Sequence, residues 1–141
     1  MKNKLLIESA YINGKFITSK HTFDVINPAT GKVIASLPDL KVADCSKAID
    51  FADKAWKSWK NTTVVERSDI LRKWYNLIQE HKDDLAEIMT LESGKPLSES
   101  MVEVDYGSSF VAWFSEEGKR AYGETIPSQN KGSRMMTIKQ G

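Results

Sequence analysis

The sequence is poor in cysteine, with Cys45 as the only one among 141 residues. A single cysteine cannot form an internal disulfide, which excludes a small secreted domain held together by such bonds. No apolar run reaches the roughly 20 residues that a membrane-spanning helix needs. Glu8 interrupts the basic N-terminal stretch before a secretory signal could form. We therefore expect a cytoplasmic protein.

An excess of charge of one sign is also lacking. The 20 basic residues nearly balance the 19 acidic ones, which gives a net charge of +1. A nucleic-acid binder would need a basic face, and none emerges. The apolar fraction of 40% and the charged fraction of 28% are typical of a globular protein rather than a disordered one. The length suits one domain.

Patterns that carry chemistry are scarce as well. Cys45 lies on the apolar stripe of an expected helix, which indicates a small buried hydrophobe rather than a nucleophile. His21 and His81 are far from Cys45 in sequence and show no metal-ligand spacing. No glycine-rich phosphate loop is present. Gly94 and Lys95 follow a helix instead of opening one, which favours a helix stop over a phosphate site.

One long amphipathic helix, from Thr63 to Pro96, organises the expected fold. Its apolar residues recur at spacings of three and four, which predicts one buried face. Thr63 and Glu66 have the spacing of a capping box at its start. Gly94 supplies the left-handed residue that ends many helices, and Pro96 does not continue one easily.

Two further helices flank this long one. The first runs from Asp39, the best N-cap candidate, to Lys60, and it should pack antiparallel to the long helix because only two residues separate them. The other runs from Ser98 to Tyr122. The tryptophans fall at helical positions of the expected core, so packing is favoured over ligand stacking. They are Trp56, Trp59, Trp74 and Trp113.

Short strands are expected at both ends of the chain. Asn13-Gly14 between two apolar pairs predicts a hairpin within residues 5–19. A second extended pair, residues 23–37, should turn at residues 27–31. Residues 134–140 form a strand with no partner in view, which would present an unpaired edge.

Four motifs then occur in order along the chain. They are Tyr11-Ile-Asn-Gly-Lys-Phe16, Ile26-Asn-Pro-Ala-Thr-Gly-Lys-Val-Ile34, Glu66-Arg67 with Ile70-Leu71, and Leu91-Glu-Ser-Gly-Lys-Pro96. Together they resemble the N-terminal part of the NAD(P)-dependent aldehyde dehydrogenase superfamily, over residues 11–140. The run from Phe110 to Pro127 is similar to the succinate-semialdehyde dehydrogenase branch. The resemblance implies an α/β parent fold, of which this chain is the mainly α part.

The resemblance implies a reaction for the complete enzyme. A cysteine thiolate attacks the aldehyde, hydride passes to NAD or NADP, and a glutamate-activated water releases the acid. In the family these groups and the Rossmann glycines come after the position of Gly141, and Cys45 does not match the catalytic cysteine's motif. We therefore expect no catalytic or cofactor-binding residue in this chain, and no activity from it alone.

The resemblance also implies roles for a few residues. The family's third helix borders the substrate tunnel, which makes Tyr106, Phe110 and Trp113 candidates for its wall, with core packing as the open alternative. Some members bind a structural monovalent cation near the positions of Ile26 and Glu92. Carbonyls at a helix C-terminus suit such an ion.

The resemblance divides the chain at residue 124. Residues 1–124 would be the first part of a cofactor-binding domain, and residues 125–141 would begin an oligomerisation segment of a homo-oligomer. Its contact residues would be Met135, Met136 and Ile138. A different class of function stays open, namely a non-catalytic helical module that dimerises through the same strand.

Overall fold

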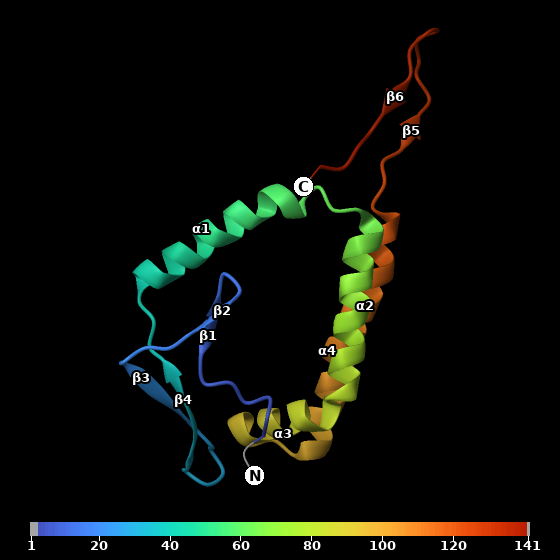
Figure 1. The fold of residues 1–141 in the computed structure, drawn as a ribbon. Coiled ribbons are helices and arrows are strands. Elements are labelled where there is room, and N and C mark those ends of the chain that lie inside the picture. The colour runs from blue at the N-terminus through green and yellow to red at the C-terminus, as the bar shows by residue number, and fades with distance from the viewer. Residues whose placement is uncertain (1–2, 141) are drawn as a thin grey trace.

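The computed structural model describes residues 3–140, in which helices and two hairpins enclose an open ring (Figure 1). A third hairpin projects away from the ring. The strands are β1 (Ala10–Ile12), β2 (Lys15–Ile17), β3 (Thr22–Ile26), β4 (Val33–Pro38), β5 (Thr125–Ile126) and β6 (Met135–Met136). The helices are α1 (Val42–Trp59), α2 (Val64–Glu80), α3 (Lys82–Ser93), α4 (Leu97–Glu117) and the short 3-10 helix η1 (Gly118–Arg120).

Both N-terminal hairpins form as the sequence predicts. β1 and β2 pair antiparallel, with Tyr11 opposite Phe16. Asn13 and Gly14 join them with φ angles of 52° and 74°. Two positive φ angles are what a tight two-residue hairpin turn requires, and asparagine and glycine adopt them at low cost. β3 and β4 pair antiparallel with an irregularity between Val25 and Ile26.

The prediction of one long helix from Thr63 to Pro96 is wrong, because α2 and α3 are separate helices that meet at His81. The backbone of His81 has φ −107° and ψ 22°, outside the helical range. Asp83 and Asp84 follow in the first turn of α3, where carboxylates favour a new helix N-terminus. The apolar spacing continues across this break, so periodicity alone did not reveal it.

The predicted signals at the two ends of this region are confirmed. The Thr63 hydroxyl accepts a hydrogen bond from the Glu66 backbone N–H at 3.2 Å, and the Glu66 carboxylate accepts one from the Thr63 backbone N–H at 2.7 Å. Gly94 ends α3 with a left-handed φ of 74°. Both signals are local, and they form regardless of what happens between them.

The prediction that the first helix packs antiparallel to the next is wrong. α1 crosses one side of the ring at a large angle to α2 (Figure 1), and none of its residues is buried. Cys45 is exposed, so its expected burial is wrong for this chain. The N-cap is Lys41 rather than Asp39. The Asp44 carboxylate accepts from the Lys41 backbone N–H at 3.2 Å, which fixes the start of the helix there.

The packed part of the molecule lies where α4 meets α2 and α3. Serines lie at the closest approaches, since Ser68, Ser100, Ser108 and Ser115 are buried. The Gln79 side chain donates to the Ser108 hydroxyl at 2.8 Å across the α2–α4 contact. Small side chains let helix backbones come close, so these helices join through a narrow polar seam rather than a wide apolar core.

The tryptophans do not fill this seam. All four are exposed, with Trp74 and Trp113 more than half accessible, so the expected core packing is wrong for the described residues. The buried hydrophobic residues are Ala35, Ala86 and Val104. The helical stripes therefore exist as predicted, but large parts of them face solvent.

The C-terminal part also differs from the prediction. The helix expected over residues 98–122 ends at Glu117 and tightens into η1. The strand expected over residues 134–140 is reduced to β6, and it does have a partner, because Met135 lies opposite Ile126 in β5. None of the helices within residues 3–140 is long and apolar enough to cross a membrane.

Candidate functional site

The three candidate tunnel residues lie on one face of α4, and Trp113 also borders a hollow with Tyr75 and Gln79 of α2. Tyr106 and Phe110 meet edge to face, with ring centroids 4.9 Å apart. The exposed fractions of Tyr106, Phe110 and Trp113 are 66%, 45% and 64%. Within the described residues these side chains therefore form an accessible aromatic strip instead of a packed core.

A groove of about 540 Å³ runs between α2, α3 and α4. Its walls are mainly apolar, although Glu92 of α3 and Glu103 of α4 also line it, as does Gly107 of α4. A Cβ atom added to Gly107 would meet no atom within 4 Å. The apolar side chains that line it from α2 and α3 are Trp74, Ile78, Leu85, Ile88 and Met89. These are members of the predicted helical stripe, but the sequence did not show that they would line an open groove.

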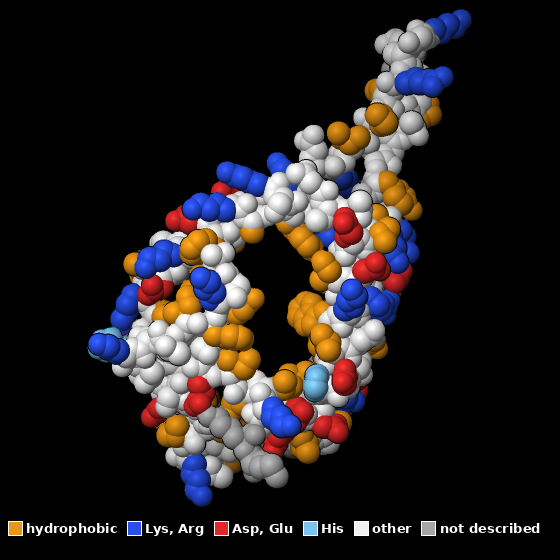
Figure 2. All heavy atoms as spheres, viewed as in Figure 1, with side chains coloured by type: hydrophobic (Ala, Val, Ile, Leu, Met, Phe, Trp, Pro, Cys, Tyr) orange, Lys and Arg blue, Asp and Glu red, His pale blue; other side chains and the backbone are white. Residues whose placement is uncertain are grey.

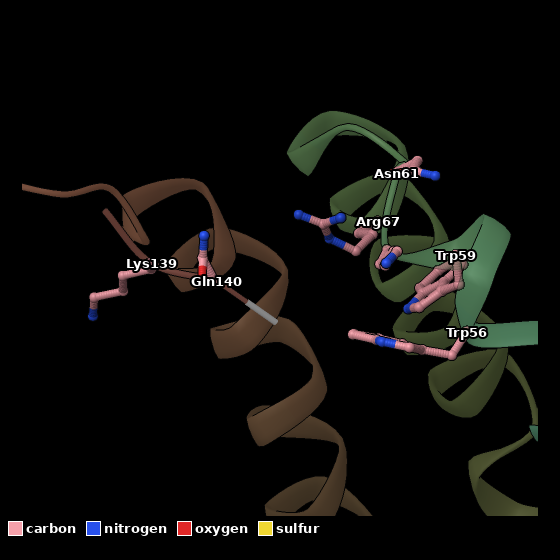
Figure 3. A pocket seen from close by; sticks show the side chains of 7 residues that line it. Trp56, Trp59, Asn61, Arg67, Lys139 and Gln140 are labelled. Atoms are coloured by element: carbon pink, nitrogen blue, oxygen red, sulfur yellow. The ribbon is translucent and has the colours of Figure 1, made fainter. Parts of the chain in front are cut away.

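A second hollow, of about 590 Å³, lies between the end of α1, the start of α2 and residues 139–140 (Figure 3). Trp56 and Trp59 form one side of it, and Arg67 and Lys139 also line it. The Arg67 guanidinium already donates to the Thr62 carbonyl at 2.6 Å. The Lys139 ammonium points away from the tryptophans (Figure 3). Lys60 lines the hollow as well. Because the Arg67 guanidinium is engaged by Thr62 and Lys139 points away, this hollow is not assigned as an anion site.

Two of the carboxylates with lowered pKa values, Asp105 and Glu116, lie in ion pairs between helices. Lys82 of α3 donates to Asp105 of α4 at 2.5 Å, which lowers the pKa of the Asp105 carboxyl. Arg72 of α2 donates to Glu116 of α4 at 2.8 Å and, together with Lys119, lowers the pKa of Glu116. A general acid or base works best with a pKa near the working pH, so these downward shifts indicate structural pairs.

The segments that hold Ile26 and Glu92 lie close together. Pro28, just after β3, lies against Gly94, just after α3, since a Cβ on Gly94 would be 2.8 Å from the Pro28 Cγ atom. α3 ends here, so the backbone carbonyls of its last turn lack partners within the helix. Such carbonyls attract cations. Residues 3–140 contain no cluster of three or more His, Cys, Asp or Glu side chains suited to a metal. A cation here would therefore rely on carbonyl oxygens.

The candidate oligomerisation residues lie on or beside the projecting hairpin. Met135 and Met136 form β6, and Ile138 follows it. All three side chains are exposed, and Ile126 of the paired strand is exposed too. A projecting two-stranded hairpin with apolar side chains and free strand edges suits pairing with another chain.

Sequence reasoning missed two features of this arrangement. One is the contact between Pro28 and Gly94, for which both residues had been noted separately as turn and helix-end signals. The other is the open space beside Gly107, a glycine inside the helix predicted over residues 98–122. A glycine kept within a helix despite its cost was the available signal.

Comparison with known proteins gives a consistent picture. The profile described as Aldehyde dehydrogenase family matches residues 16–141. The chain is 45% identical over 140 residues to an Escherichia coli succinate-semialdehyde dehydrogenase named for NADP(+), covering 98% of this chain and 29% of the relative. It is 46% identical over 139 residues to a glutarate-semialdehyde dehydrogenase of Pseudomonas putida, covering 97% and 29%.

A solved structure shows the same fold. The aldehyde dehydrogenase from Brucella melitensis biovar abortus 2308 matches with a TM-score of 0.92 and 47% identity, over 95% of this chain and 28% of that chain. This chain therefore spans less than a third of the length of the relatives it matches.

Proposed function

Because the chain belongs to the aldehyde dehydrogenase family, we propose that it is the N-terminal part of an NAD(P)-dependent enzyme that oxidises a semialdehyde to the acid. In this proposal residues 1–124 begin the cofactor-binding domain, and the groups that react with aldehyde and nicotinamide lie outside the 141 residues. The identity of 45–46% to two semialdehyde dehydrogenases is the observation that carries the proposal.

The proposed substrate class is a short aldehyde with an acidic group at its other end. Succinate semialdehyde and glutarate semialdehyde are the substrates named for the two relatives, and they differ by one methylene. NAD or NADP is the proposed hydride acceptor, and the name of the E. coli relative favours NADP. The cofactor supplies the hydride chemistry, and the protein orients the aldehyde toward it.

We assign the aromatic strip of α4 to the wall of the substrate tunnel. Tyr106, Phe110 and Trp113 are rigid and exposed on one helix face, so they can border a passage once another segment faces them. They would exclude water from the aldehyde and set the space available to it. Their proposed role is positioning, because they offer the passage mainly aromatic rings.

The corner between β3 and α3 is proposed to hold a structural monovalent cation near Ile26 and Glu92. The contact of Pro28 with Gly94 supports this proposal, because it holds the carbonyl-bearing ends of both segments at one corner. The hairpin of β5 and β6, with Met135, Met136 and Ile138, is proposed to join the assembled enzyme into a homo-oligomer.

The exposed hairpin also favours a second candidate function, a non-catalytic module that dimerises through β6. Light scattering after size exclusion separates the two, with Met136→Lys as the test variant. A dimer of the free chain that Met136→Lys dissociates supports the module. A monomeric free chain at high concentration leaves only the enzyme proposal.

The enzyme proposal is tested by a fusion in one polypeptide. This chain replaces the matched 29% of the E. coli succinate-semialdehyde dehydrogenase, and NADP reduction is followed with succinate semialdehyde. We expect turnover within about tenfold of the parent enzyme. A folded, oligomeric fusion without turnover would contradict the proposal.

A further inference from the structure

The ring has an opening that passes through the molecule in the space-filling view, and hydrophobic side chains gather around it (Figure 2). Folded proteins fill their interiors to the density of organic crystals, and large voids lined by apolar groups are not left empty. The ring is nevertheless held closed. The Asn3 side-chain amide donates to the Asp84 carbonyl at 2.9 Å, and Pro28 packs on Gly94.

The helices of the ring carry more apolar surface than they bury. α1 has no buried residue, although Phe51, Trp56 and Trp59 lie along it. Most of the stability of a helix in a protein comes from packing of its apolar face against other segments. α4 carries exposed apolar side chains on the face opposite its serine seam, since Val104 is buried toward α2 and α3 while Phe110 is exposed on the other side. An apolar stripe along a helix is the face that becomes buried against another segment.

Gly107 points to a covering segment that comes very close. Glycine in a helix interior costs roughly 1 kcal/mol relative to alanine. Apart from its own stretch of helix, no atom of the described residues lies within 4 Å of a Cβ added there, so no packing contact in this structure requires glycine. The residue lines the apolar groove between α2, α3 and α4. Another backbone lying in that groove would require it.

The solved Brucella aldehyde dehydrogenase indicates that the covering segment belongs to the remainder of such an enzyme. It contains the same arrangement at a TM-score of 0.92, within a chain of which this region is only 28%. The ring therefore keeps its shape inside a much longer polypeptide. A second copy of this chain is a less suitable occupant of the ring, because it would add another open ring instead of a segment that fills the opening.

We propose that this chain binds, as a separate polypeptide, an aldehyde dehydrogenase chain that lacks the matching segment, and that the groove containing Gly107 is part of the docking surface. The inference rests on the proposed function. Packing of apolar surface needs no covalent link, and a link only raises the effective concentration of the two parts. Docking of the two polypeptides would therefore restore a complete enzyme.

The test is a co-expression of this tagged chain with the E. coli succinate-semialdehyde dehydrogenase from which the matched 29% has been removed. We expect the two chains to co-purify in equal amounts and to reduce NADP with succinate semialdehyde. Recovery of the tagged chain alone, with the partner chain absent or insoluble, would overturn the proposal. So would a tagged chain that recovers only as its own dimer.

Gly107→Leu tests the groove without harming the fold. Leucine favours helix and has open space around it here, so the free chain should be as stable or more stable. We expect at least a tenfold loss of co-purified partner. Gly118→Leu is the matched control, because Gly118 also has nothing within 4 Å of an added Cβ yet lies outside the groove. Equal losses for both variants would overturn the assignment of the groove.

The result of this docking test can be distinguished from the result of the test of the proposed function. An active single-chain fusion together with failed co-purification refutes only docking of separate chains. Inactivity of a folded fusion refutes the proposed function itself. An active fusion in which Gly107→Leu has no effect would show that no backbone lies in the groove.

Discussion

Pro28 lies so close to Gly94 that a Cβ atom on the glycine would come within 2.8 Å of the proline Cγ atom. The two residues are 66 positions apart, and they join the turn after β3 to the end of α3. Gly94 has a φ of 74°, so this position needs glycine both for its backbone and for its neighbour. The contact helps to close the ring.

Gly94→Ala should therefore destabilise the chain more than Gly31→Ala does. Gly31 has a similar φ of 70° but no atom within 4 Å of an added Cβ. The left-handed backbone alone costs an alanine about 1 kcal/mol in both variants. We expect a lower urea midpoint for Gly94→Ala, and Pro28→Ala in the same chain should remove most of the difference. Equal midpoints for the two glycine variants would contradict the contact.

Thr63→Ala should lower the free energy of unfolding by about 1 kcal/mol, because it removes the side chain that caps α2. Thr63→Ser is the control, since it keeps the hydroxyl. Thermal melting followed by circular dichroism measures both. A Thr63→Ser variant as unstable as Thr63→Ala would mean that the methyl group, and not the hydroxyl, stabilises the helix.

Stability should also fall on acidification through Glu66. The Thr63 backbone N–H, and then its hydroxyl, hold the pKa of the Glu66 carboxyl below its ordinary value of 4.5. A carboxyl with a lowered pKa in the folded state stabilises the fold above the pKa of the unfolded chain, and this is lost as pH falls through the folded pKa. Urea midpoints of wild type and Glu66→Gln should therefore converge below pH 4.5. A constant difference across the acid range would refute the linkage.

Ser108→Leu should destabilise the chain by about 1–3 kcal/mol, the usual cost of overpacking a tight contact. Ser108 is buried between α4 and α2, and it accepts a hydrogen bond from Gln79. Ser109→Leu is the neighbouring control, because Ser109 is exposed. Chemical unfolding of both variants gives the comparison. A stable Ser108→Leu variant would show that the serine seam does not set the spacing of these helices.

Phe110→Ala in the single-chain fusion should alter the choice between substrates that differ by one methylene. Widening a tunnel wall should favour glutarate semialdehyde over succinate semialdehyde, by about tenfold or less in the ratio of kcat/KM. Val111→Ala is the control on the same helix, because Val111 lines the groove toward α2 and α3 instead of the strip. An unchanged ratio in Phe110→Ala would remove Phe110 from the tunnel wall.

Sequence reasoning succeeded where the structure depends on a few adjacent residues. The hairpin at Asn13 and Gly14, the capping box of Thr63 and Glu66, and the helix end at Gly94 are all of this kind. Each depends on backbone preferences or hydrogen bonds within about four residues. The family motifs were likewise recognisable because they combine several such turns in a fixed order.

The sequence was less informative where contacts between distant segments determine the structure. The break at His81 is hidden because apolar spacing runs on through it, and the direction of α1 depends on contacts outside the helix. An apolar stripe predicts that a helix face becomes covered, but it does not say by which segment. Cys45 and Trp74 were therefore expected in a core, although within this chain they are exposed.

The most direct measurement is NADP reduction with succinate semialdehyde, made on the free 141-residue chain and on the fusion, each with and without Cys45→Ser. If the reacting groups lie outside this chain, the free chain gives no NADPH, and the fusion keeps its full rate when Cys45 is replaced. Turnover by the free chain that Cys45→Ser abolishes would contradict the account.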